Sequence, residues 1–223
     1  MVEWLKYQDS YNLHVPIHRR FRRINYDISN IDCLWEADLV DLKHLKDADD
    51  GYQHLLVILD VLSKYVWVEP LKDKSANEVR RAFEVILDQN EKRSPACLHS
   101  DRGKEFLGAV FQNFLSTRGI RFRPVRDPNV KAAVAERYHR TLKEHIWRYF
   151  THSNIHRYIN VLQQILQGYN NSRHSSIRIR PSEVTLENAA HARLNSQRKY
   201  GRRALHGKKP KYKVTDNVRI SRE

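Results

Sequence analysis

Residues 52–71, YQHLLVILDVLSKYVWVEPL, decide the fold class, because they hold two apolar runs rich in β-branched and aromatic side chains. The runs are interrupted near residues 60–63, DVLS, which predicts two neighbouring strands joined by a turn. WEADLVDL (35–42) is a strand candidate before them, and ACLHS (96–100) and IRFRPV (120–125) are short strand candidates after them. The pattern therefore predicts a sheet of five strands.

Helical patterns separate and follow these strands. Apolar side chains with helical spacing predict helices over 75–90, 109–119, 131–150 and about 155–170. Ser75 is a suitable N-terminal cap for the first of these, and Gly119 a suitable end for the second. Strands that alternate with helices predict an α/β fold with a central sheet.

Composition limits the class of protein. The 223 residues suit one domain with appendages, and a net charge of +14 predicts a polyanionic partner, most simply nucleic acid. Two cysteines give no disulfide framework, and no apolar run approaches the roughly 20 residues that span a bilayer. These features predict a soluble intracellular protein with no membrane partner.

The charge is concentrated at the C-terminal end. Residues 191–223 hold 11 Lys and Arg against two Asp and Glu, whereas residues 35–190 are close to balance. This distribution predicts an electrostatic arm on a folded domain, and a merely solvated end is the alternative.

Acidic residues fall at the ends and interiors of the predicted elements. Asp101 follows an apolar run in LHSDRGKEF (98–106), where it could either turn the chain or bind a ligand. Asp38 lies in the first predicted strand and Glu136 in the first turns of a long helix. Three converging carboxylates need a cation between them, and Mg²⁺ prefers oxygen ligands. Two such ions could support in-line displacement at a phosphodiester.

Four stretches together resemble the catalytic core of retroviral and retrotransposon integrases, most nearly the integrases of Maverick/Polinton transposons. They are WEADLVDL (35–42), LHSDRGKEF (98–106), AAVAERYHRTLKEHIWRYF (132–150) and YNNSRHSSIRIRPSEV (169–184). The resemblance implies a ribonuclease H-like fold, in which a central mixed five-stranded sheet is flanked by helices. It also implies metal-dependent DNA cleavage and joining. Asp38, Asp101 and Glu136 match the family's catalytic, metal-binding triad, with Mg²⁺ as cofactor and Mn²⁺ as a substitute.

The resemblance also suggests how the chain is divided. Residues 1–34 resemble a basic linker, residues 35–185 the catalytic core, and residues 186–223 a basic helix followed by the start of a truncated SH3-like or chromodomain-like segment. His14 and His18 have the spacing that opens a zinc domain, but Cys33 is the only cysteine near them, so we predict no zinc site.

Basic residues predict where DNA is contacted. Arg140 and Lys143 lie four and seven residues after Glu136 and so share its helix face. In the basic tail the predicted DNA-binding residues are Arg202, Arg203, Lys208 and Lys209. The expected partners are the element ends and target DNA, bound by a homo-oligomer in the nucleus. The alternative is a DNA- or chromatin-binding protein that a host has retained from an integrase, with weak or no catalysis.

Two further acids are predicted to lie outside the site. Asp41 is three residues after Asp38 and so on the opposite face of the strand, which predicts a structural or solvent-facing role. Asp60 falls in the break between the two apolar runs, which predicts a turn carboxylate.

Overall fold

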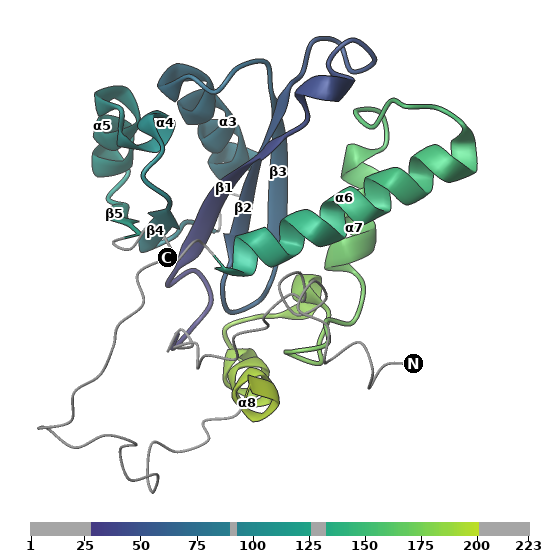
Figure 1. Ribbon diagram of the computed structural model, residues 1–223. Helices are drawn as coiled ribbons and strands as arrows, with labels where there is room; N and C mark the ends of the chain where they lie inside the picture. Colours follow the sequence, from purple (N-terminus) through teal and green to yellow (C-terminus); the bar gives the residue numbers. More distant parts are fainter. Residues whose placement is uncertain (1–27, 90–92, 126–132, 201–223) are drawn as a thin grey trace, which may run out of the picture.

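The computed structural model describes residues 28–89, 93–125 and 133–200, which form three layers with a sheet in the middle (Figure 1). The strands are β1 (Trp35–Asp41), β2 (His54–Asp60), β3 (Val66–Leu71), β4 (Cys97–Ser100) and β5 (Arg121–Pro124). Their order across the sheet is β3-β2-β1-β4-β5. The first three strands pair antiparallel, whereas β4 is parallel to β1 and β5 is parallel to β4. The sheet is therefore mixed, as predicted.

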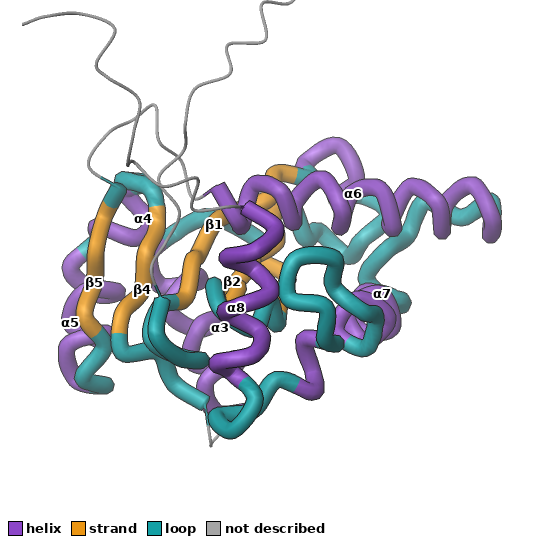
Figure 2. The backbone as a smooth tube through the Cα atoms, turned by 90° about the horizontal axis from the view of Figure 1, so that it is seen from below, coloured by secondary structure: helices purple, strands orange, loops and turns teal. Residues whose placement is uncertain are grey.

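The helices cover both faces of this sheet. α3 (Ala76–Gln89), α4 (Lys104–Leu107) and α5 (Ala109–Thr117) lie on one side, and α6 (Ala133–Ser153) and α7 (Leu162–Asn170) on the other (Figure 1). α8 (Ala189–Tyr200) lies at the lower end of the molecule, as Figure 2 shows from below. Two short 3₁₀ helices, Lys43–Leu45 and Pro181–Glu183, complete the elements of the described ranges. None of the helices in the described ranges is long and apolar enough to cross a bilayer.

Alternation along the strands builds two separate cores. Every residue of β2 is buried, which explains its continuous apolar sequence. Leu55 and Val57 pack with Leu142 of α6 on one face of the sheet. Leu56 and Ile58 pack with α3 and α5 on the other face. The sheet is thus held from both sides, and β1 runs through its centre.

A partly buried ion-pair network fixes the turn after β2. The Asp60 carboxylate is fully buried and accepts a hydrogen bond from the Ser63 backbone N–H at 3.1 Å. Arg93 donates to Asp60 at 3.1 Å and to Asp32 at 2.7 Å, and its guanidinium lies over the Trp67 ring. The prediction that Asp60 is a turn carboxylate is confirmed.

Most of the predicted elements are found within a few residues of their expected bounds. One prediction is wrong in part: the helix expected over 155–170 begins only at Leu162. α6 ends before Asn154, which has a positive φ of 54°. The backbone N–H groups of Tyr158 and Ile159 then donate to the Asp49 carboxylate instead of joining a helix. The four-residue helix α4 was not predicted.

Candidate functional site

Two acids of β1 point toward α6. Residues 36, 38 and 40 share one face of the strand, and Val40 packs in the same core as α6. Glu36 is fully buried, whereas Asp38 is partly exposed. One oxygen of Asp38, Oδ1, accepts the backbone N–H of Leu39 at 2.8 Å. The face of β1 that meets α6 is therefore acidic at two successive positions.

Asp101 follows the end of β4, the strand beside β1. The register of these parallel strands pairs Glu36 with His99, and Asp38 and Asp101 each lie two residues further along. The two aspartates are thus placed at the same level of the sheet. Asp101 is exposed, and its Oδ1 accepts the backbone N–H of Gly103 at 3.1 Å. Asp101 therefore forms a turn, and the rest of its carboxylate is open to a ligand.

Glu136 lies in the first turn of α6 and is exposed. His139, one turn further on the same side of the helix, brings α6 to β1: its Nδ1 is 3.6 Å from Oδ2 of Asp38. Burial, and then the nearby Lys143 ammonium, lower the pKa of His139 to about 4. His139 is therefore neutral at pH 7, so its contact with Asp38 is not an ion pair at that pH.

The three predicted acids are not gathered around one point. Within residues 28–89, 93–125 and 133–200, no three His, Cys, Asp or Glu side chains lie close enough together to hold a metal ion. Their chemistry still suits Mg²⁺, because all three present carboxylate oxygens and hard cations prefer oxygen ligands. The three acids therefore fit Mg²⁺ in the type of ligand atom that they offer, and they lie on β1, at the end of β4 and on α6. The close approach of the three carboxylates that the sequence predicted is not found among the described residues.

Asp101 and Glu136 are exposed, and Asp38 is partly exposed. A hollow of about 820 Å³ lies against the outer strand β5, where Gln112, Arg121 and Arg123 line it, and it contains none of the three acids. Carboxylates that are exposed in this way are accessible to a large substrate.

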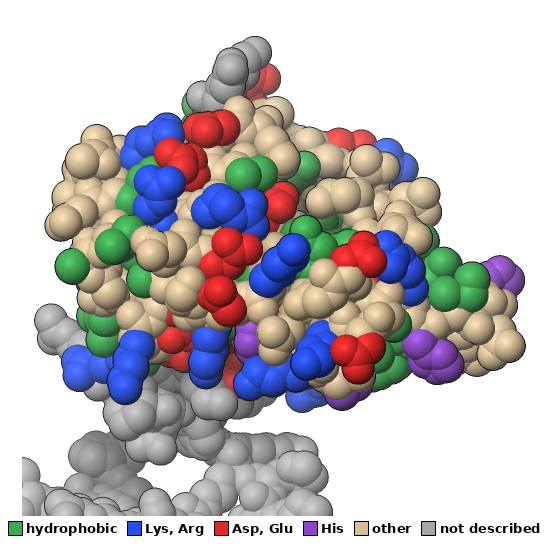
Figure 3. Space-filling model, turned by 90° about the horizontal axis from the view of Figure 1, so that it is seen from above, with side chains coloured by type: hydrophobic (Ala, Val, Ile, Leu, Met, Phe, Trp, Pro, Cys, Tyr) green, Lys and Arg blue, Asp and Glu red, His purple; other side chains and the backbone are tan. Residues whose placement is uncertain are grey.

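Basic side chains accompany the acids on α6. Arg140 and Lys143 are both exposed, whereas Tyr138 and Leu142 on the opposite side of the helix are buried. The predicted shared face of Glu136, Arg140 and Lys143 is thus present. Figure 3 shows Lys and Arg side chains in a row along one edge of the molecule, with both charges mixed over the rest of that view.

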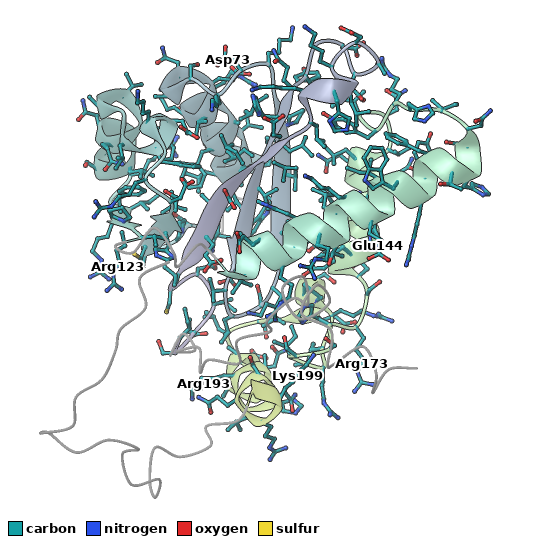
Figure 4. The ribbon with its side chains drawn as sticks, in the orientation of Figure 1. Asp73, Arg123, Glu144, Arg173, Arg193 and Lys199 are labelled. Atoms are coloured by element: carbon teal, nitrogen blue, oxygen red, sulfur yellow. The ribbon has the colours of Figure 1, made fainter. Side chains whose placement is uncertain are left out.

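The predicted contacts of the basic tail lie outside the described residues. These are Arg202, Arg203, Lys208 and Lys209, and His14 and His18 also lie outside. Within the described part, Figure 4 shows Arg193 and Lys199 on α8 and Arg173 on the segment before it, at the lower end of the molecule. Asp41 is 60% exposed at its side chain and lies 3.5 Å from the Lys43 ammonium, as its predicted solvent-facing role requires.

Sequence reasoning missed two residues of this site, Glu36 and His139. Glu36 carries a usable signal, because it lies two residues before Asp38 and so on the same face of the strand. His139 carries the corresponding helical signal, three residues after Glu136. Neither signal reveals which residue of the other element each side chain contacts.

Comparisons with known proteins agree with this architecture. The family profile described as "Integrase core domain" matches residues 32–129. A transposon-derived protein of Caenorhabditis elegans is 33% identical over 144 residues, which cover 64% of this chain and 49% of that protein. The Pro-Pol polyprotein of simian foamy virus type 3 is 31% identical over 71 residues, 32% of this chain and 6% of the polyprotein. The chain thus spans about half the length of the first relative and a small part of the second.

Solved structures show the same fold at low sequence identity. The HTLV-2 integrase catalytic core domain in complex with magnesium superimposes with a TM-score of 0.57 at 19% identity, over 69% of this chain and 95% of that one. A chain of the simian T-cell lymphotropic virus intasome gives a TM-score of 0.65 at 16% identity, over 98% of this chain and 71% of that one. The mixed five-stranded sheet with its flanking helices is accordingly ribonuclease H-like, as predicted.

Proposed function

We propose that this chain, which contains an integrase core domain of the retroviral and transposon superfamily, cuts and joins DNA strands in a divalent-metal-dependent reaction. The observation that carries the proposal is the placement of the three acids. Asp38 is on the central strand, Asp101 is at the same level after the neighbouring parallel strand, and Glu136 lies in the first turn of α6, which packs against the central strand. The assignment to Maverick/Polinton-type elements stays a prediction.

Asp38, Asp101 and Glu136 would hold Mg²⁺, or Mn²⁺ in its place. When bound, such ions supply Lewis-acid stabilisation of the attacking and leaving oxygens at a phosphodiester. The HTLV-2 integrase core was solved in complex with magnesium, which supports this choice of ion. In our proposal the chain's own acids position the ions, and His139 lies beside Asp38, with its Nδ1 3.6 Å from Asp38 Oδ2.

The basic face of α6 would hold the DNA backbone. Arg140 and Lys143 are exposed on the helix that carries Glu136, so a phosphate bound there lies close to the acids. The proposed partners are element ends and target DNA, and the proposed setting is the nucleus. The HTLV-2 integrase catalytic core domain was solved in dimeric and trimeric forms, which supports a homo-oligomer as the active species.

A branched DNA that mimics the joined product tests this function. Phosphodiester exchange is reversible, and this substrate does not require two separate ends to be brought together. We expect the chain to resolve the branch in Mg²⁺, and Asp38→Asn to reduce the rate by at least about a hundredfold, since metal stabilisation contributes several kcal/mol.

The matched control is Asp41→Asn, which removes one carboxylate from the same strand at an exposed position. It should keep the wild-type rate. No branch resolution by the wild-type chain in Mg²⁺ or Mn²⁺ would contradict the proposal and favour a protein that binds DNA without catalysis.

A further inference from the structure

Glu36 joins the central strand to the start of α6. Its carboxylate is fully buried, and Oε2 accepts two backbone hydrogen bonds, from Val134 at 3.1 Å and from Ala135 at 2.9 Å. These are the second and third residues of α6, whose first N–H groups have no partner inside the helix. A side chain just before the helix usually accepts these bonds. Here a side chain from β1 caps the helix.

The arrangement suits a carboxylate in particular. A negative charge at a helix N-terminus is stabilised by the helix dipole, and the two N–H bonds offset part of the cost of burying the charge. The second oxygen, Oε1, has no hydrogen-bond partner among the described residues, and its distance to His99 Nδ1 is 3.8 Å. Leaving one oxygen of a buried acid without a partner is costly, so the two backbone bonds to the other oxygen carry most of the stabilisation at this position.

The two bonds link neighbours of two proposed catalytic acids. Asp38 lies two residues after Glu36 on β1, and Glu136 directly follows Ala135 on α6. Core packing of Tyr138 and Leu142 holds the body of α6 against the sheet, and the Glu36 bonds add a polar link at the first turn. Because a displacement of about 1 Å in a reacting group can cost about a hundredfold in rate, the link sets the geometry on which the acids depend.

We infer that Glu36 is a positioning residue, which docks the first turn of α6 on β1 and thereby sets the position of Glu136 relative to Asp38. Only the catalytic consequence of this inference depends on the proposed function. The docking of α6 on β1 does not depend on catalysis and can be measured without substrate.

Two substitutions separate the role of the acceptor from that of the side chain's bulk. Glu36→Ala removes the acceptor, so backbone amide exchange over residues 133–137 should become about tenfold faster, as expected when a helix cap is removed. Glu36→Gln keeps an oxygen that can accept both bonds, so exchange there should stay within about threefold of wild type. The branch-resolution rate should follow the same order, falling by at least about tenfold in Glu36→Ala and little in Glu36→Gln.

Asp49 provides a matched control in the same chain. It is also fully buried, one oxygen accepts two backbone N–H groups, from Tyr158 and Ile159 at 2.9 Å each, and the other oxygen has no hydrogen-bond partner among the described residues. It holds the segment after α6 and not the start of the helix. Asp49→Ala should lower the melting temperature while exchange over residues 133–137 stays as in wild type.

Hydrogen–deuterium exchange with mass spectrometry tests the inference on four proteins, which are the wild type, Glu36→Ala, Glu36→Gln and Asp49→Ala. The inference is supported if Glu36→Ala alone accelerates exchange in the first turn of α6 and Glu36→Gln restores protection. It is overturned if Glu36→Ala leaves that turn protected, if Asp49→Ala accelerates it equally, or if Glu36→Gln is as fast as Glu36→Ala. If wild type resolves no branch yet this exchange pattern holds, the proposed function fails and the docking role stands.

Discussion

Glu36 and Ala135 are 99 positions apart in the sequence, yet Oε2 of Glu36 lies 2.9 Å from the backbone nitrogen of Ala135. This contact joins the central strand of the sheet to the first turn of the long helix across it. A second contact follows on the same two elements, where His139 Nδ1 lies 3.6 Å from Asp38 Oδ2. The candidate site is therefore a junction between β1 and α6, and Asp101 follows the end of β4, the strand beside β1.

Removing two carboxylates should abolish metal binding. We expect Mg²⁺ or Mn²⁺ to bind the wild-type chain with heats that calorimetry detects, and the double variant Asp38→Asn, Asp101→Asn to show none. The variant should be about as stable as wild type without metal, because Asp101 is exposed and Asp38 is partly exposed. The single variant Asp41→Asn serves as the control, and unchanged heats in the double variant would exclude these aspartates as ligands.

Neutralising the basic face of α6 should weaken DNA binding. Arg140→Ala with Lys143→Ala removes two proposed phosphate contacts, so the log–log salt dependence of duplex binding should flatten by about 1.8, or 0.9 for each phosphate. Lys72→Ala with Lys74→Ala removes the same charge from exposed positions on another part of the surface and should leave the slope nearly unchanged. Equal slopes for the two double variants would mean that α6 does not face DNA.

The basic tail should bind further phosphates. Replacing all four predicted DNA-binding residues with alanine should flatten the same salt dependence by up to about 3.6, at 0.9 for each phosphate that is no longer bound. The four residues are Arg202, Arg203, Lys208 and Lys209. Anisotropy of a labelled duplex, measured over a salt series, gives the slope. A slope equal to that of wild type would show that the tail does not touch DNA.

His174 should make stability depend on pH. Burial, followed by the nearby Lys64 and Lys199, lowers the pKa of His174 to about 4, and its Nδ1 lies 3.3 Å from the Ser176 backbone N–H, which donates to it. The unfolded chain binds a proton at the ordinary pKa of about 6.5, so the free energy of unfolding falls as the pH falls from 6.5 to 4. The loss of unfolding free energy reaches about 3 kcal/mol at pH 4.

Denaturation of His174→Asn across this pH range tests the effect. The variant cannot take up the proton, so its stability should fall less steeply than that of wild type between pH 6.5 and 4. Other titrating groups are common to both proteins and cancel in the comparison. Parallel pH profiles would contradict the assignment of the effect to His174.

The sequence was sufficient to predict the sheet and most helices, because their signals are local. Continuous apolar runs predicted β2 and β3, and helical spacing predicted α3 and α6. The late start of α7 was not predictable in this way. It depends on Asp49, which lies more than 100 positions away and holds the backbone of Tyr158 and Ile159 out of a helix.

The site was predictable in its parts but not in its arrangement. Sequence reasoning placed Asp38, Asp101 and Glu136 on the strand, strand end and helix where they are found. It did not foresee that Asp38 bonds the N–H of Leu39 and Asp101 that of Gly103, so that each carboxylate turns partly to its own backbone. The role of Glu36 was hidden because its partners are nearly 100 residues away.

The central claim is that the three acids catalyse strand transfer on DNA held by the same surface, and one variant tests it most directly. Glu136→Gln removes a proposed metal ligand at an exposed position without changing the size of the side chain. DNA affinity and branch resolution should be measured on the same preparation in Mg²⁺. We predict that Glu136→Gln binds the branched duplex within about threefold of wild type and resolves it at least about a hundredfold more slowly. Branch resolution at the wild-type rate would contradict the claim.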